Sequence, residues 1–293
     1  MTELMYAQLS DRRIVRISGR DCDTLIENLI TNSLAHLSAQ AAIHSGLLSP
    51  QGKILFDFFL LRNGQDLMVD IEHTSVEGFI QRLTLYKLRA DVTFEVMPDD
   101  LAVVAAWGKD NQRFPGGVIA FKDPRQSALG YRLVLPRERL PELAGHEAGE
   151  DDYHAHRIAV GVPEAGQDFA IGNAFPHEAL YDQLAGVDFS KGCFVGQEVV
   201  SRMQHRGTAR KRVVSIVGDT QLVSGAEIMA GDAGIGTVGS VSGNRGLAMI
   251  RLDRAHEANV KDVAMLAGDV TVKLEQPTWF KLDLATGKSL DKV

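Results

Sequence analysis

The chain has 293 residues, of which 45% are hydrophobic and 24% charged, and its formal net charge is −7 at pH 7. This length allows two or three packed units, and the negative charge disfavours a general nucleic-acid binder. No stretch approaches the roughly 18 apolar residues of a membrane span, and the first residues lack the pattern of a signal peptide. Only two cysteines occur, Cys22 and Cys193, so we expect no disulfide framework, no metal site and a cytoplasmic location.

The first two thirds of the chain alternate strand and helix patterns. Helices are expected from Asp21 or Asp23 through Ile30, around Phe79 to Tyr86, and from an acidic cluster at 147–152 through Val160. Asn63-Gly64 is the favoured pair for a type I′ hairpin. Strands are expected at 14–18, 42–48, 54–61, 67–71, 92–96, 101–107 and 130–135. This order predicts an α+β fold with antiparallel sheets.

The composition changes after Gly207, where glycines and β-branched residues dominate. Short strands with glycine turns predict a small C-terminal β-barrel or sandwich, with strands at 213–217, 235–242, 247–252 and 270–274. We therefore divide the chain into residues 1–206 with two interleaved α+β subdomains, a β-barrel at 207–285, and a flexible tail at 286–293.

Asp57 is an acid inside an apolar strand pattern, Leu55-Phe56-Asp57-Phe58-Phe59. Burial of a carboxylate is costly unless it has a partner. Strand alternation allows Asp57 to face solvent or to cap a loop, which would require no function. The functional interpretation places the carboxylate in an apolar cavity, where it binds a polar ligand and transfers a proton.

Cys193 lies in the run Lys-Gly-Cys-Phe-Val-Gly-Gln-Glu at 191–198. An apolar stripe formed by Val195, Val199, Val200 and Met203 predicts a helix directly after the cysteine. A thiol before a helix N-terminus and beside Lys191 is expected to have a lowered pKa. The alternative is a buried, inert cysteine followed by an ordinary Glu198–Arg202 helix pair.

The run 191–198, with Arg202 and Arg206-Gly207, resembles the signature of the YgfZ-type folate-binding proteins. These are relatives of the glycine-cleavage T-protein, an aminomethyltransferase, and include mitochondrial iron–sulfur assembly factors. Thr31-Asn32 and the run 52–57 resemble the T-protein segment whose aspartate faces the folate, and Asp57 falls on that position. The resemblance implies a T-protein-like fold with sheets around a central cavity and a C-terminal barrel.

The resemblance also implies a function. It suggests a tetrahydrofolate-binding protein that supports assembly or repair of four-iron clusters in client enzymes, including tRNA-modifying radical enzymes, through iron–sulfur carrier or client proteins. Cys193 and Asp57 would be the catalytic residues. By the same resemblance, the folate would be bound by polar side chains that lie in the segments similar to the family: Asp57, Arg157, Glu178, Lys191, Gln197, Glu198 and Arg202.

One position departs from the T-protein pattern. The T-protein carries a glutamate two residues after the helix arginine, where this chain has Ala159 after Arg157. The second hypothesis is a folate-dependent one-carbon transferase, with Asp57 as the acid–base group. The departure at Ala159 argues against true aminomethyl transfer and therefore ranks this hypothesis below cluster assembly. Arg157 then has a structural salt bridge as its alternative role. A third hypothesis is a non-catalytic adaptor. In it, the basic residues from Arg202 to Arg212 and the signature helix bind a cluster-carrier protein, and the folate pocket is vestigial.

Overall fold

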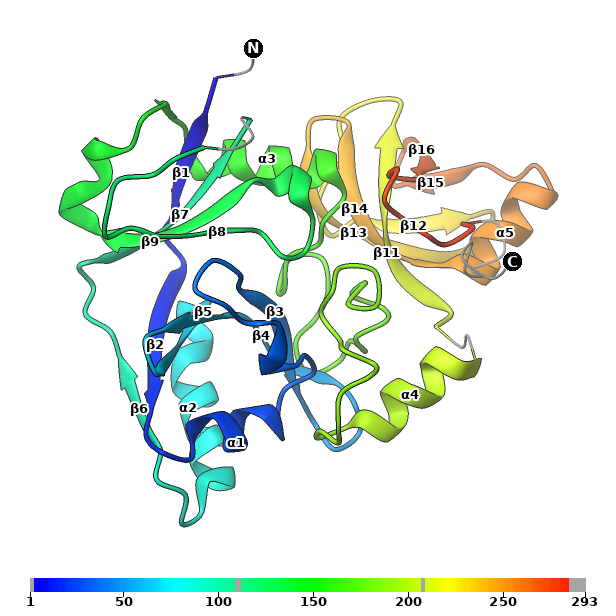
Figure 1. Cartoon of the computed structure of the whole chain (residues 1–293). Coiled ribbons are helices and arrows are strands. Elements are labelled where there is room, and N and C mark those ends of the chain that lie inside the picture. The colour runs from blue at the N-terminus through cyan, green and yellow to red at the C-terminus, as the bar shows by residue number, and fades with distance from the viewer. Residues whose placement is uncertain (1–2, 109–111, 207–208, 285–293) are drawn as a thin grey trace. The chain divides into compact units, whose positions relative to one another are not determined.

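The computed structural model describes residues 3–108, 112–206 and 209–284, which form two compact units (Figure 1). The first unit contains residues 1–50, 55–153 and 184–195, and the second contains residues 51–54, 154–183 and 196–293. Gly207 and the predicted tail at 286–293 lie outside the described residues. The division of the chain at 206/207 stays a prediction.

The first unit holds two five-stranded sheets in the described part of the chain. In order across the first sheet, the strands are β3 (Ile43–Leu48), β4 (Ile54–Asn63), β5 (Asp66–Glu72), β2 (Arg12–Ser18) and β6 (Thr93–Val96). The second sheet consists of β10 (His146–Glu147), β1 (Met5–Leu9), β7 (Leu101–Trp107), β9 (Tyr131–Pro136) and β8 (Ile119–Lys122). The pairing is antiparallel as predicted, except that β1 and β10 are parallel.

Helices cover the outer face of the first sheet. The short α1 (Cys22–Glu27) and α2 (Val76–Lys87) lie beside β2 and β5 in Figure 1. Ile26 of α1 and Phe79 of α2 pack in one apolar core with strand residues such as Ile17. The predicted hairpin between β4 and β5 is present, but its turn differs from the predicted one. Asn63 pairs with Asp66, so Gly64 and Gln65 are the central residues, and of these two only Gly64 has a positive φ, at +62°. The type I′ turn expected for the Asn63-Gly64 pair is therefore wrong, because that turn requires a positive φ at both central residues.

The two sheets pack against each other through a second apolar core, to which Met68 of β5 and Val103 of β7 contribute. A buried ion cluster crosses the same interface. The carboxylate of Asp70 on β5 is fully buried, and it accepts hydrogen bonds from Arg12 Nε at 2.7 Å and Arg132 Nη2 at 2.6 Å. Arg132 belongs to β9 of the other sheet, so one carboxylate ties the two sheets together.

The second unit contains a closed β-barrel, as the sequence predicted. Its strands, in order around the barrel, are β11 (Lys211–Gly218), β14 (Arg245–Arg251), β13 (Ala233–Ser242), β12 (Glu227–Ala230), β15 (Met265–Ala267) and β16 (Val270–Glu275). The helix α5 (Leu252–Val260), which the sequence analysis did not predict, follows β14. Two further helices are α3 (Glu150–Val160), whose last seven residues belong to this unit, and α4 (Gln197–Arg206).

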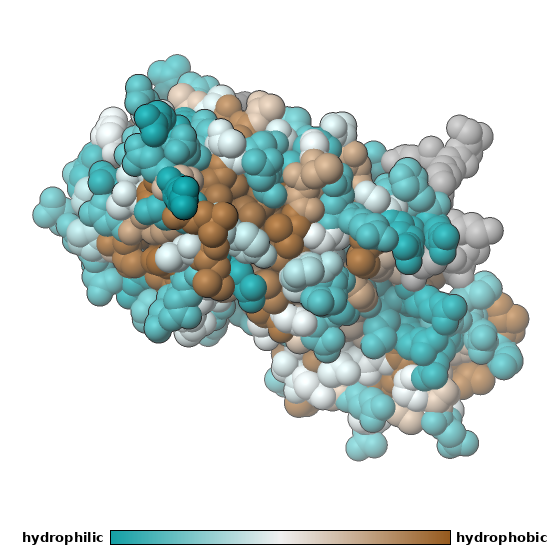
Figure 2. All heavy atoms as spheres, turned by 90° about the horizontal axis from the view of Figure 1, so that it is seen from below, coloured by the Kyte–Doolittle hydropathy of each residue, from teal (hydrophilic) through white to brown (hydrophobic). Residues whose placement is uncertain are grey.

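Apolar side chains reach the surface of the first unit near the end of α2. Leu85 is 69% exposed and Leu88 87% exposed, and Val96 of β6 is 48% exposed. The space-filling view in Figure 2 shows apolar side chains gathered over part of the face seen from below. In the described residues, no helix is long and apolar enough to cross a membrane.

The Asp70 cluster leads to a stability prediction. Burial alone would raise the pKa of Asp70, but Arg12 and Arg132 lower it below its ordinary value. We expect Asp70→Asn to reduce the free energy of unfolding by about 3–5 kcal/mol, because it leaves buried guanidinium groups without a carboxylate. Asp253→Asn removes an exposed pair with Arg251 and is expected to cost less than about 1 kcal/mol. Urea unfolding at pH 7 measures both.

The same experiment has a pH dependence of fixed sign. Because the folded-state pKa of Asp70 is depressed, its contribution is fully present above the unfolded value of about 3.9 and is lost as the pH falls through the folded value. The difference between wild type and Asp70→Asn should therefore shrink only below about pH 4. Equal effects of the two substitutions at pH 7 would contradict this account.

Candidate functional site

Cys193 is exposed and lies in a loop, four residues before the first residue of α4. The predicted apolar stripe began the helix at Val195, but α4 begins at Gln197, after Gly196 with a φ of +81°. Phe194, the next residue, is buried with 8% of its surface exposed. The chain therefore points one side chain into the protein and leaves the neighbouring thiol at the surface.

The Lys191 side chain anchors this loop to the backbone of the segment after α1. Its side chain is 2% exposed, and Nζ donates to the carbonyl oxygens of Glu27 at 2.7 Å, Ile30 at 2.9 Å and Asn32 at 2.8 Å. Glu27 is the last residue of α1, and Ile30 and Asn32 follow it. Backbone acceptors at a helix C-terminus lack helical partners, and the helix dipole favours a cation there. Burial lowers the pKa of Lys191, and the nearby Glu27 opposes that shift.

Two polar residues of the predicted motif fix the segment that leads to this loop. Thr31 Oγ1 donates to the carbonyl oxygen of Gly186 at 2.6 Å. Asn32 Nδ2 donates to the carbonyl oxygens of Ala185 at 2.7 Å and His44 at 2.9 Å. Thr31 and Asn32 are buried, so their contribution is to position the Cys193 loop against the first sheet.

Asp57 does not face solvent. Its side chain is 7% exposed, and its Oδ2 lies 2.7 Å from Nε2 of His44. His44 belongs to the neighbouring strand β3, and its side chain is 4% exposed. The sequence analysis missed His44, although neighbouring strands can bring residues 13 positions apart together. A carboxylate beside an imidazole is an arrangement that can hold or move a proton.

His44 lies at the edge of a cluster of aromatic and cationic groups. Its ring centroid is 5.4 Å from that of Phe59. The guanidinium carbons of Arg132 and Arg125 lie 4.3 Å and 4.8 Å from the centroid of the Phe59 ring. The Asp57–His44 pair is therefore in the same unit and the same core region as the buried ion cluster.

Arg157 has a structural role in the second unit. The side chain is fully buried, and Nη1 donates to Asp168 Oδ2 at 2.7 Å and to the carbonyl oxygen of Val162 at 2.9 Å. Its Nη2 donates to Gln167 Oε1 at 3.1 Å. This is the salt bridge that the sequence analysis named as the alternative to folate binding.

The remaining predicted ligand-binding residues are also in the second unit. Gln197, Glu198 and Arg202 lie on the first turns of α4, and Arg202 Nη2 donates to Glu198 Oε1 at 3.0 Å. The side chains of Glu198 and Arg202 are 86% and 59% exposed, so this is the ordinary helix pair. Glu178 Oε2 accepts a hydrogen bond from the backbone N–H of Phe175 at 2.8 Å.

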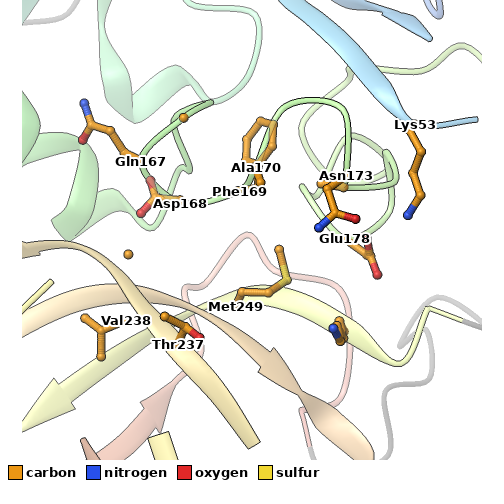
Figure 3. A pocket seen from close by; sticks show the side chains of 14 residues that line it. Lys53, Gln167, Asp168, Phe169, Ala170, Asn173, Glu178, Thr237, Val238 and Met249 are labelled. Atoms are coloured by element: carbon orange, nitrogen blue, oxygen red, sulfur yellow. The ribbon is translucent and has the colours of Figure 1, made fainter. Parts of the chain in front are cut away.

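Glu178 also lines a pocket of about 370 Å³, which lies wholly within the second unit. One wall is the 166–174 loop, and the other is formed by the barrel strands β13 and β14. Figure 3 shows Lys53, Asn173 and Glu178 together at one side of it, with Phe169 and Met249 nearer its middle. None of the other predicted site residues lines this pocket.

The described residues contain no group of three or more His, Cys, Asp or Glu side chains placed to hold a metal ion. The structure thus brings together Lys191 and Cys193 with the Thr31-Asn32 segment, and Asp57 with His44, in the first unit. Arg157, Glu178, Gln197, Glu198 and Arg202 belong to the second unit.

Comparison with known proteins agrees with this fold. The sequence model of the family described as "CAF17, C-terminal beta-barrel domain" matches residues 210–282, which contain all six barrel strands. The glycine cleavage system aminomethyltransferase T from Bartonella henselae has a similar structure, with a TM-score of 0.73 and 14% sequence identity. The similarity covers 94% of this chain and 86% of that one, which confirms the predicted T-protein-like fold.

Two relatives are named as iron–sulfur cluster assembly factors. The IBA57 homolog of Mycosarcoma maydis is 34% identical over 228 residues, which cover 72% of this chain. The chain spans only about half the length of this fungal relative, at 56%. Human IBA57 is 31% identical over 273 residues, which cover 83% of this chain and 76% of the human protein. The YgfZ signature itself stays a prediction.

The comparison corrects one prediction. Both relatives are named as mitochondrial proteins, which contradicts the cytoplasmic location expected from the cysteine content. Two cysteines without a disulfide framework indicate a reducing environment, and this property does not distinguish one reducing compartment from another. The identity to human IBA57 over three quarters of that protein shows that the chain belongs to the family of IBA57 iron–sulfur cluster assembly factors.

Proposed function

We propose that this protein supports the assembly of iron–sulfur clusters of the four-iron type in client enzymes, and that Cys193 is the residue through which it acts. The observation that carries the proposal is an exposed thiol on a loop whose neighbouring lysine is fixed by three backbone carbonyls. The relatives named as iron–sulfur cluster assembly factors support the same role. Iron–sulfur carriers and client enzymes, including tRNA-modifying radical enzymes, are the proposed partners.

A loop fixed through Lys191 suits a thiolate that must meet a cluster on another protein. A thiolate binds iron, and only an accessible sulfur can reach a cluster that a partner carries. The Lys191 ammonium group is already bound by backbone carbonyls of the chain. The loop therefore loses little conformational entropy when a partner protein binds. The cluster is cargo in this proposal, since one thiolate is too few to hold it permanently.

A reduced folate is the proposed cofactor, and Asp57 with His44 is its proposed polar contact. A buried carboxylate next to an imidazole can accept a hydrogen bond from a ring N–H of a pterin and exchange a proton with it. The same pair would supply acid–base chemistry in a folate-dependent one-carbon transferase. Ala159 argues against aminomethyl transfer, so cluster assembly remains the preferred function.

The first prediction concerns the two cysteines. Cys193→Ala is expected to reduce four-iron enzyme activity to the level of cells that lack the protein, because no other exposed thiol exists among the described residues. Cys22→Ala is the matched control and is expected to keep that activity, because Cys22 is buried in an apolar core. Complementation of the deletion strain measures four-iron and two-iron enzymes in parallel. Full activity with Cys193→Ala would refute the assignment.

The same two thiols are expected to differ in reactivity. Burial raises the pKa of Cys22 to about 11, and its hydrogen bond to Asp23 adds to the shift. At pH 7.5 Cys22 is therefore protonated, and it is also buried, so reagents do not reach a thiolate there. Cys193 is exposed and accessible to reagents. Limited treatment of the folded protein with iodoacetamide, followed by peptide mass spectrometry, should place the label on Cys193. Equal labelling of both would contradict the structure.

A third prediction tests the folate contact. Asp57→Asn and His44→Gln are each expected to weaken tetrahydrofolate binding by about tenfold or more, since a hydrogen bond to a charged group contributes about 1.5–3 kcal/mol. Asp219→Asn, an exposed aspartate in the barrel unit, is the control. Anaerobic titration calorimetry measures the affinities. Unchanged binding by both variants would place the folate elsewhere, without affecting the assignment of Cys193.

A further inference from the structure

The pocket beside the barrel has an uneven distribution of charge. Lys53 precedes β4, and Lys211 is the first residue of β11, so two distant parts of the chain bring ammonium groups to one pocket. Burial lowers the pKa of Lys53, Glu178 opposes that shift, and the positive charge of Lys211 lowers it further. The two lysines are therefore close enough to repel each other, and Glu178 compensates only one of the two charges.

The other carboxylate of the pocket is already neutralised. Asp168 Oδ2 accepts from Arg157 at 2.7 Å and from the backbone N–H of Glu164 at 2.8 Å. Its Oδ1 accepts from the backbone N–H and the hydroxyl of Ser240 at 2.8 Å and 2.6 Å. Both oxygens of Asp168 are used by these contacts, and Arg157 balances its negative charge. Asp168 therefore lines the pocket without compensating the charge of the lysines. The pocket keeps an excess of positive charge.

Apolar groups line the rest of the pocket. Phe169 and Ala170 contribute from the loop, and Val238 and Met249 from the barrel strands. Figure 3 shows Met249 reaching from the barrel toward the loop that carries Phe169. Lys53 itself rests on an aromatic face, with Nζ 3.2 Å from the centroid of the Phe175 ring. The volume of about 370 Å³ falls within the range of small-molecule sites, about 300–1,000 Å³.

We propose that this pocket binds a small anionic molecule with an aromatic or otherwise flat apolar body, whose carboxylate or phosphate lies between Lys53 and Lys211 and whose body lies against Phe169 and Met249. An anion there relieves the repulsion between the ammonium groups. A polarizable thioether and an aromatic ring favour a flat ligand body over a hydrated one. The proposal does not depend on cluster assembly or on the folate contact of Asp57.

The test uses phenyl phosphate and benzoate as probes of the two anionic groups. Titration into the full-length protein is followed by calorimetry and by the NMR signal of the Met249 methyl group, assigned with Met249→Leu. We expect at least one of the two probes to shift this signal. Inorganic phosphate is expected to bind at least about tenfold more weakly than phenyl phosphate, because it lacks the apolar body.

Variants separate the charges from the cavity. Lys53→Met and Lys211→Met should each weaken the binding probe about tenfold, whereas Lys273→Met, an exposed lysine on β16 outside the pocket, should not. Ala170→Trp should abolish binding by filling the pocket while keeping both lysines. Thermal unfolding of each variant checks that it is folded.

Three results would overturn the proposal. The first is that neither probe shifts the Met249 signal. The second is that inorganic phosphate binds as tightly as phenyl phosphate, which would reduce the site to a surface attraction for anions. The third is that folded Lys53→Met and Lys211→Met proteins bind the probe as well as the Lys273→Met protein does.

Discussion

The first unit depends on one buried carboxylate. Asp70 binds Arg12 within its own sheet and Arg132 in the other sheet, so the register of the two sheets is fixed by an ion cluster as well as by apolar packing. A buried charge is tolerated only when its partners are close and well oriented. The guanidinium carbons of Arg12 and Arg132 also lie 5.8 Å and 4.3 Å from the centroid of the Phe59 ring, and the centroid of the His44 ring lies 5.4 Å from it. The ion cluster that stabilises the first unit and the Asp57–His44 pair therefore lie in the same core region, around Phe59.

The candidate site depends on the same requirement, that buried polar groups have hydrogen-bond partners. The end of α1 leaves backbone carbonyls without helical partners, and the Lys191 ammonium group satisfies three acceptors in this region at once. Thr31 and Asn32 bind the backbone of the segment just before the loop. The motif residues around Cys193 thus act mainly as a support, and the thiol is the group that this support presents to other molecules.

Local patterns predicted most of the elements because hydrophobic periodicity and turn residues act over short distances. The β4–β5 hairpin, the helices α2 and α3, and the barrel strand β13 are examples. The short strand β10 and the helix α5 carry weak patterns, and only tertiary packing stabilises them. The burial of Arg157 and the pairing of Asp57 with His44 depend on contacts between distant residues or adjacent strands, which a single sequence does not encode locally. Glu198 and Arg202 form an exposed pair on α4, and their predicted role in folate binding stays a prediction.

The carboxylate of Asp168 has a consequence for how the second unit folds. It receives Arg157 from the end of α3 on one oxygen and Ser240 from barrel strand β13 on the other. A Cβ at the adjacent Gly239 would lie 2.5 Å from Asp168 Oδ1, so only glycine permits this approach. A barrel cut away from residues 154–183 would lose an acceptor for the Ser240 groups and expose the glycine surface of β13. The barrel and residues 154–183 therefore belong to one compact unit, and the start of the barrel family match at residue 210 lies inside this unit.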